Sequence, residues 1–204
     1  MLLPSQHHPK NSQPEKEAEE AMGWLDEVPR AGGLYIGGLH ALFQKQDLFK
    51  KERITHIVSV IDFDLYENDT FSHYKRIQIK LDDDPNENLL EHFPATNAFI
   101  SDALKDGTGR VFVHCAMGKS RSATIVCAYL MFKYGVSPSK ALEQLCEGRP
   151  VCEPNPGFQE QLRVYEKMLK AKDESERDGV YQHWIKNRYT GTWYSDMRQQ
   201  AWKL

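Results

Sequence analysis

The ten residues from Val113 to Ser122 (VHCAMGKSRS) bring a cysteine, a glycine and an arginine close together in the chain. β-branched residues precede this segment and an apolar helical pattern follows it, which predicts a strand, a tight turn and a helix start. In that arrangement the backbone N–H groups of the turn point at one spot, where the helix dipole also favours negative charge. The segment therefore predicts an anion-binding loop, formed by Ala116, Met117, Gly118, Lys119 and Ser120.

Four side chains of this segment give the predicted anion site its chemistry. Arg121 carries a planar, always-charged guanidinium that can bind two phosphate oxygens. Cys115 would lie in the same positive field, which favours the nucleophilic thiolate over the thiol. A thiolate facing a phosphate held in this way is set up for in-line attack and a phosphocysteine intermediate. Ser122 is placed to hydrogen-bond the sulfur and help it leave, and His114 is expected to orient the loop and tune the thiol rather than transfer protons.

The stretch HCAMGKSRS resembles the H-C-x-x-G-x-x-R-[ST] motif of protein tyrosine phosphatases and their dual-specificity relatives. Three further segments, LYIGG, ITHIVSVI and NPGFQEQL, extend the resemblance over residues 30–170. It implies an α/β fold and hydrolysis of phosphate monoesters without a metal or another cofactor. The alternative for Cys115 is a buried, inert cysteine at a strand end, and the complete motif argues against it.

The family also uses a general acid that protonates the leaving oxygen, an aspartate in the loop well before the cysteine. Asp82, Asp83 and Asp84 occupy that region, followed by Pro85. Alignment of the next residues with the family pattern favours Asp83 as the acid, with Asp84 as the alternative. For the other aspartates of the run we expect a solvated loop.

Asn155 lies in the segment PNPGF, and the resemblance implies that it supports the phosphate loop by hydrogen bonding. The same segment is typical of a helix start, at which Asn155 would be a plain cap. The two roles are compatible.

Lys119 bears on the choice of substrate. A small domain is expected to have a shallow pocket, so phosphotyrosine, phosphoserine and phosphothreonine of a phosphoprotein substrate would all reach Cys115. A lysine at this position resembles phosphoinositide phosphatases, in which basic loop residues neutralise extra phosphates, but position 116, often basic there, is Ala116 here. A phosphoinositide or another non-protein phosphate is therefore the alternative substrate.

Within the family, the chain is most similar to atypical dual-specificity phosphatases that carry a C-terminal zinc-binding domain and are linked to late maturation of the large ribosomal subunit. The similarity rests on the short N-terminal strand segment, the run of three aspartates, and residues 180–184 (VYQHW), which resemble the linker after that catalytic domain. No cysteine follows Cys152, so the zinc domain is absent from this sequence. A second alternative is an assembly factor with secondary phosphatase activity, which binds pre-ribosomal particles through the missing domain.

The other cysteines, Cys127, Cys146 and Cys152, form no C-x-x-C pair and have no histidines at a converging spacing. A metal site is therefore not expected. We interpret all three as packing residues. The alternative is a resolving cysteine that forms a disulfide with Cys115 under oxidation.

Short apolar strands alternate with helical patterns along the chain, which predicts an α/β domain whose central sheet of four or five strands is flanked by helices. Strands are expected at 34–36, 54–61, 74–81 and 110–113. Helices are expected at 40–51, 89–105, 122–134, 137–146 and 156–170. The helix at 122–134 is apolar on nearly every face, so it should be the buried central helix.

Composition divides the chain into three parts. Residues 1–22 are polar and acidic, which predicts a flexible tail. Residues 23–171 are predicted to form the catalytic domain. Residues 172–204 are predicted to begin as a linker (KDESERDG) and to continue with three tryptophans, which pack on the domain or meet an absent partner: Trp184, Trp193 and Trp202.

The whole-chain properties exclude several classes of protein. A net charge of -3 does not favour direct binding of nucleic acid or a membrane surface. The longest apolar run, Ala123–Phe132, is shorter than the about 20 residues that span a bilayer. The first residues (MLLPSQHHPK) lack the apolar core of a signal peptide. The cytoplasm or the nucleus is therefore the expected location, where thiols stay reduced.

Overall fold

The computed structural model describes residues 23–66 and 71–192. Its centre is a five-stranded sheet with the order β1-β2-β5-β3-β4. The four longer strands run parallel to one another, and the two-residue β1 pairs antiparallel with β2. The strands are β1 (Asp26–Glu27), β2 (Leu34–Gly38), β3 (His56–Val60), β4 (Lys75–Ile79) and β5 (Val111–Cys115).

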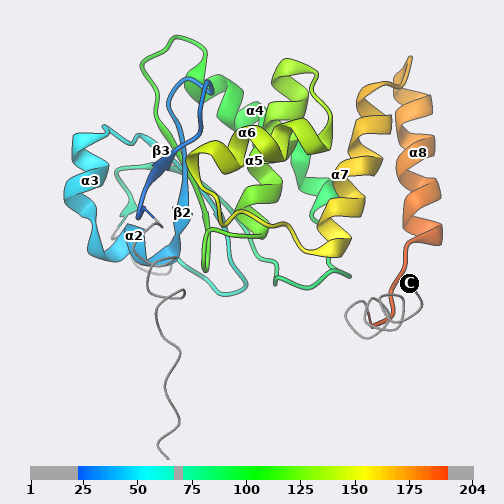
Figure 1. Ribbon diagram of the computed structural model, residues 1–204, viewed down its shortest axis with the longest axis horizontal. Helices are drawn as coiled ribbons and strands as arrows, with labels where there is room; N and C mark the ends of the chain where they lie inside the picture. Colours follow the sequence, from blue (N-terminus) through cyan, green and yellow to red (C-terminus); the bar gives the residue numbers. More distant parts are fainter. Residues whose placement is uncertain (1–22, 67–70, 193–204) are drawn as a thin grey trace, which may run out of the picture.

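Helices cover both faces of this sheet (Figure 1). Two short helices, α2 (Leu39–Gln44) and α3 (Gln46–Lys51), pack on one face. The other face carries α4 (Phe93–Leu104), α5 (Arg121–Tyr134), α6 (Pro138–Gly148), α7 (Pro156–Leu169) and α8 (Glu174–Asn187). The expected α/β fold is therefore confirmed. Among the helices of the described ranges, none has the length and apolar character needed to cross a membrane.

The central strand β5 is apolar except at His114. Side chains alternate across a strand, so Val111 and Val113 belong to the core beneath α5 while Phe112 packs against Phe49 of α3. A parallel strand covered on both faces is mostly apolar, and the one polar side chain here, His114, is hydrogen-bonded to Ser59. The strand therefore ends with Cys115 fully inside the domain.

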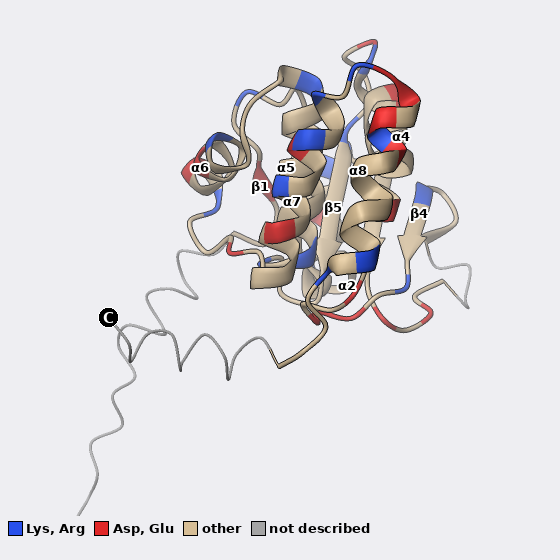
Figure 2. Cartoon of the chain, turned by 90° about the vertical axis from the view of Figure 1, so that its right-hand side faces the viewer, with Lys and Arg blue, Asp and Glu red and all other residues tan. Residues whose placement is uncertain are grey.

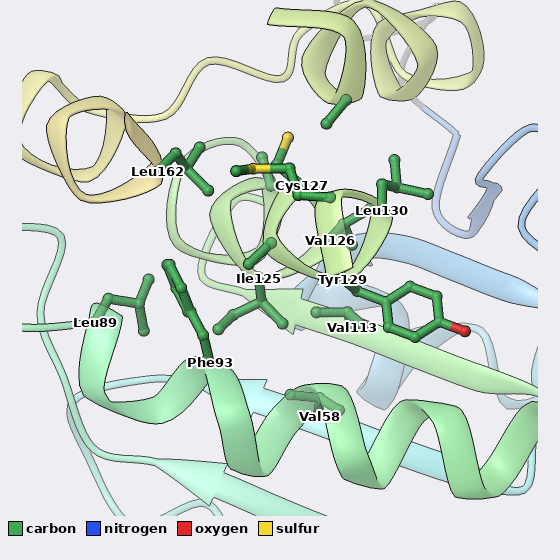
Figure 3. Close-up of a cluster of buried hydrophobic side chains, with 14 of the residues drawn as sticks. Val58, Leu89, Phe93, Val113, Ile125, Val126, Cys127, Tyr129, Leu130 and Leu162 are labelled. Carbon is green, nitrogen blue, oxygen red and sulfur yellow. The ribbon is translucent and has the colours of Figure 1, made fainter. Parts of the chain in front are cut away.

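Helix α5 is the buried central helix, as predicted. Every residue from Arg121 to Met131 is buried. In Figure 3, Ile125 and Tyr129 of α5 lie against Val113 of the sheet, with Phe93 on a neighbouring helix. Because α5 starts a few residues after β5 ends, the core fixes both ends of the predicted anion-binding loop.

Two helices differ from their predicted extents. The region 40–51 forms two helices instead of one, because Lys45 leaves the helical conformation (φ -128°, ψ 40°) between α2 and α3. The region 89–105 begins with a 3-10 turn (η2, Leu90–His92), and α4 follows with Pro94 in its first turn, where proline is favoured. The short edge strand β1 has no periodic sequence pattern and was not expected.

The prediction of a linker from residue 172 is wrong. Residues Glu174–Asn187 form α8, and the side chain of Asp173 caps it by accepting a hydrogen bond from the Glu176 N–H at 2.8 Å. The charged run is thus the capped first half of a helix, whose apolar residues come later. Figure 2 shows α8 beside α7, and Trp184 is buried against the main core (7% exposed). The predicted tail (1–22), Trp193 and Trp202 lie outside the described residues.

If α8 belongs to the cooperative domain, the Trp184→Ala substitution should lower the free energy of unfolding by about 3 kcal/mol, because it leaves a cavity in the core. Urea unfolding followed by circular dichroism measures this effect. Phe132→Ala is the control, because that side chain is half exposed on α5. An unchanged midpoint in Trp184→Ala would mean that α8 does not stabilise the domain.

Candidate active site

The loop between β5 and α5 has all five of its carbonyl oxygens, from Ala116 to Ser120, hydrogen-bonded to donors outside the loop. The donors come from the α2 start, α5, the end of α6 and the segment before α7. The bonds are Leu39 N to Ala116 O (3.0 Å), Arg149 Nη2 to Met117 O (3.1 Å), Arg149 Nε to Gly118 O (2.8 Å), Glu153 N to Lys119 O (2.8 Å) and Thr124 N to Ser120 O (2.9 Å).

Since the carbonyls are held outward, the opposite sides of these peptide units are free to face a ligand. Within the described ranges, the backbone N–H groups from Met117 to Ser120 have no hydrogen-bond acceptor. These N–H groups also lie at the positive end of α5. Convergent N–H groups at a helix start suit the binding of an anion.

Glycines let the loop lie directly against β2. Gly118 has φ +68°, in the left-handed region, and the place of a Cβ there is occupied by backbone atoms of Gly37. A Cβ on Gly38 would in turn lie 3.0 Å from the carbonyl oxygen of Ala116. Gly38 thus leaves room for the loop, whereas a Cβ on Gly37 would meet the Trp24 carbonyl and the Phe112 ring, which explains why two glycines end the LYIGG segment.

Cys115 and Arg121 stand at the two ends of this loop. The Cys115 Sγ lies 3.3 Å from the Ser122 Oγ, within hydrogen-bond distance for a sulfur. Arg121 is buried, and its Nη1 donates to the Leu81 carbonyl at 3.0 Å. Its Nε is also buried and has no acceptor among the residues that the structure describes. An oxygen of a bound phosphate would satisfy that donor.

Asp83 is the aspartate of its run that contacts the loop. Its Oδ1 accepts hydrogen bonds from the Ser120 hydroxyl (2.6 Å) and from the Asn155 Nδ2 (2.9 Å). Asp84 instead accepts from the Asn86 N–H (2.7 Å) and closes its own turn. The Asp82 carboxylate accepts from the next backbone N–H in the same loop (2.7 Å).

Asn155 makes both kinds of contact that were expected of it. Its Oδ1 caps α7 by accepting from the Phe158 N–H at 2.9 Å. Its backbone N–H donates to the Ser120 hydroxyl at 3.0 Å, and its side-chain amide reaches Asp83. One residue therefore ties the helix start, the loop and the aspartate together.

His114 is fully buried behind the loop. Its Nε2 is hydrogen-bonded to the Ser59 hydroxyl (2.7 Å), and its ring stacks on Phe112 with centroids 5.4 Å apart. Burial, helped by the nearby charge of Arg121, lowers the pKa of His114 to about 4. The imidazole is therefore neutral near pH 7, which suits an orienting role and not proton transfer.

Arg149 is the residue of this site that sequence reasoning missed. Besides the two loop carbonyls it donates to the Gly23 carbonyl at 2.8 Å and forms a buried ion pair with Asp26. Burial raises the pKa of Asp26 above its usual value, against the attraction of Arg149. Its partners lie 31 to 126 residues away along the chain, so no local pattern could have marked it.

The other three cysteines are free thiols. Burial raises the pKa of Cys127 and of Cys146, and it raises the pKa of Cys152 to about 12. The Cys152 Sγ lies 3.9 Å from the Gly118 carbonyl oxygen, on the outer side of the loop. Thiols held in the protonated form are poor nucleophiles, so these surroundings favour the packing interpretation.

A cavity of about 320 Å³ opens beside the loop. Its rim includes two exposed apolar side chains, Met117 (62% exposed) and Trp24 (41% exposed). Lys119, also on the loop, is exposed and pairs with Glu153 at 2.9 Å. Besides two loop residues, Arg149 is the part of the site that lines this cavity, so the cavity lies on the carbonyl side of the loop and Cys115 does not line it. The residues lining this cavity are Gly23, Trp24, Gly38, His40, Ala41, Ala116, Met117 and Arg149.

Comparison with known proteins agrees with this geometry. Residues 34–168 match the family model of the dual specificity phosphatase catalytic domain. The tyrosine-protein phosphatase YVH1 of Saccharomyces cerevisiae is 37% identical over 161 residues, covering 70% of this chain and 44% of that protein. The dual specificity protein phosphatase 1 of Arabidopsis thaliana is 38% identical over 142 residues, or 70% of each chain.

A solved structure is similar over nearly its whole length. The crystal structure of the Yvh1 phosphatase domain from Chaetomium thermophilum has a TM-score of 0.65 and 38% identity, and it covers 74% of this chain and 99% of that one. This chain spans less than half the length of the yeast relative, so the similarity concerns the phosphatase domain of that protein.

The lowered pKa of His114 predicts an acid-dependent loss of stability. Taking about 6.5 for the unfolded histidine, its neutral burial stabilises the fold fully above that pH, and the contribution is lost as pH falls towards 4. Between pH 7 and 5, urea unfolding of the wild type should lose about 2 kcal/mol more than that of His114→Gln. His40→Gln, an exposed site, is the control. If the free energy of unfolding fell equally with pH in the wild type and in His114→Gln, the assignment would be contradicted.

Arg149→Met should open the loop, because two carbonyls and a buried carboxylate lose their donor. We expect about 3 kcal/mol less free energy of unfolding and at least fivefold weaker binding of inorganic phosphate, measured by calorimetry. Arg163→Met removes an exposed arginine of α7 and is the control. Phosphate affinity like that of the wild type in Arg149→Met would show that the carbonyls are held without it.

Proposed function

This chain belongs to the family of dual-specificity phosphatase catalytic domains, and we propose that it hydrolyses phosphotyrosine, phosphoserine and phosphothreonine in phosphoproteins through a phosphocysteine intermediate. The observation that carries the proposal is the loop whose carbonyls are all bound outward while its N–H groups from Met117 to Ser120 have no acceptor among the residues that the structure describes. Such a loop stabilises the equatorial oxygens of a transferring phosphoryl group. Cys115 and Arg121 at its ends supply the nucleophile and the fixed positive charge.

In the first step the Cys115 thiolate attacks phosphorus in line with the leaving oxygen. The S–P bond forms as the P–O bond to the substrate side chain breaks. The protonated Asp83 gives its proton to the leaving oxygen, which departs as an alcohol or a phenol. The loop N–H groups and Arg121 stabilise the negative charge that the phosphoryl oxygens keep throughout.

In the second step water attacks the phosphocysteine. Asp83, now a carboxylate, takes a proton from that water, and the P–S bond breaks to release inorganic phosphate and the thiolate. The Ser122 hydroxyl, 3.3 Å from the sulfur, donates a hydrogen bond to the departing thiolate. His114 is neutral and holds the strand end that carries Cys115. All atoms and charges balance without a metal ion.

The surroundings of the loop support a protein substrate. Met117, exposed on the loop itself, offers an apolar contact to a phosphotyrosine ring or to the residues beside a phosphoserine. Lys119 has its charge paired with Glu153 and lies in solvent, which gives no particular support to a site for extra phosphates of a phosphoinositide. An assembly role in ribosome maturation stays an alternative that concerns a longer protein.

The test is hydrolysis of an aryl phosphate and of phosphotyrosine and phosphothreonine peptides in the presence of EDTA. We expect turnover by the wild type that is lost in Cys115→Ser. Asp83→Ala should reduce kcat/KM about 10²-fold and remove the basic limb of the pH profile, since the protonated acid is then missing. Asp84→Ala should stay within about threefold of the wild type, because this side chain faces its own turn.

Turnover that persists in Cys115→Ser, or that needs a divalent metal, would contradict the mechanism. Loss of the basic limb in Asp84→Ala but not in Asp83→Ala would move the acid to Asp84. Turnover of a phosphoinositide panel without turnover of the peptides would favour the lipid alternative. If neither the peptides nor the phosphoinositides were hydrolysed, the domain would be better described as a phosphate-binding module.

A further inference from the structure

Helix α8 and the residues just after it lie beyond the segment that matches the family model, which ends at 168. They nevertheless contact the loop 82–88, which carries the proposed general acid. Figure 1 shows α8 next to α7 at the edge of the helical layer. In Figure 2 the same two helices lie side by side.

Hydrogen bonds join this C-terminal part to the acid loop. The Asn88 Nδ2 donates to the Tyr181 hydroxyl at 2.9 Å, and the Arg188 Nη1 donates to the Asn86 carbonyl at 3.0 Å. The Asn86 Nδ2 donates to the Gly191 carbonyl at 3.2 Å. These bonds fall on the middle and the end of the loop, between Asp83 and the start of η2.

The remaining supports of the loop come from α7. The Gln161 Oε1 accepts from the Leu89 and Leu90 N–H groups at 2.9 and 2.8 Å, and its Nε2 donates to the Glu87 carbonyl at 2.8 Å. Gly157 at the start of α7 leaves room only for the backbone of Pro85. The loop therefore lies between α7 and α8, and its carboxylate at Asp83 meets the phosphate loop at the far end.

The contacts of α8 are themselves held in place. Trp184 is buried against the main core, and Tyr181 packs partly buried on the same core. The Arg188 guanidinium lies 5.5 Å from the centre of the Trp184 ring, in the geometry of a cation–π contact. This contact orients the Arg188 guanidinium, which donates to the Asn86 carbonyl.

We propose that Tyr181 and Arg188 are positioning residues for general-acid catalysis, which act by fixing the loop that presents Asp83. The inference rests on the proposed function, because it takes Asp83 as the acid. A segment without regular structure gains much conformational freedom when its anchors are removed. A catalytic group displaced by about 1 Å can lose as much as 10²-fold in rate, so the anchors matter even though they never touch the substrate.

The experiment compares two substrates that differ in how much they need the acid. Phenyl phosphate has a poor leaving group, like phosphotyrosine, whereas 4-nitrophenyl phosphate has a good one. In the double variant Tyr181→Phe with Arg188→Gln, kcat/KM should fall about tenfold on phenyl phosphate and no more than about twofold on 4-nitrophenyl phosphate. The basic limb of the pH profile on phenyl phosphate should weaken in parallel.

Lys186→Gln is the matched control, because it removes one positive charge from the same end of α8 at an exposed position. Its kcat/KM on both substrates should equal that of the wild type. Equal losses on both substrates in the double variant, or no loss on either, would overturn the proposal. The first result would indicate general destabilisation, which the thermal midpoint reports separately.

Failure of the proposed function has a different outcome. It would appear in the wild type as the absence of turnover dependent on Cys115, or as an unchanged pH profile in Asp83→Ala. If those two tests succeed and the double variant behaves as the wild type, only the role of α8 is overturned.

Discussion

The structure depends on how the peptide units of one short loop are oriented. Each carbonyl from Ala116 to Ser120 is bound from outside, and this leaves a row of N–H groups without acceptors within the described ranges. Convergent N–H groups at the start of a helix favour negative charge, so the loop suits an anion. The donors that hold the carbonyls come from β2–α2, α5, Arg149 and the segment before α7. The loop is therefore a product of the whole domain.

Burial shifts the pKa values of the groups around this loop in opposite directions: it raises those of the thiols and lowers that of the imidazole. Burial raises the pKa of the thiols of Cys127 and Cys152, so they remain neutral packing groups. His114 is buried as well, which keeps it neutral and hydrogen-bonded to Ser59. Cys115 is equally inaccessible by side-chain area, yet it alone stands at the end of a strand that faces the loop amides and the start of α5. Cys115 therefore differs from Cys127 and Cys152 in its position beside the loop amides and the start of α5, and not in its burial.

The proposed acid comes from a different part of the chain and needs its own support. Asp83 reaches the phosphate loop through Ser120 and Asn155, while α7 and α8 hold the residues that follow it. Cys115 and the proposed acid are thereby carried by separate elements that meet only in the folded domain. Helix α8 lies beyond the segment that matches the family model, and it contacts the end of the acid loop that is farther from Asp83.

The sequence by itself determined what depends on neighbours along the chain. The strand, turn and helix around Cys115, the buried α5, the proline-led helices α6 and α7, and the cap at Asn155 all follow from local pattern. Only the tertiary structure decided which aspartate meets the loop, why two glycines end β2, and that Arg149 holds the carbonyls. The charged run before residue 180 has a local cap at Asp173, but only the tertiary structure showed that its helix is held to the domain by a tryptophan on a distant core. These features rest on contacts between residues far apart in sequence, and periodicity carries no information about such partners.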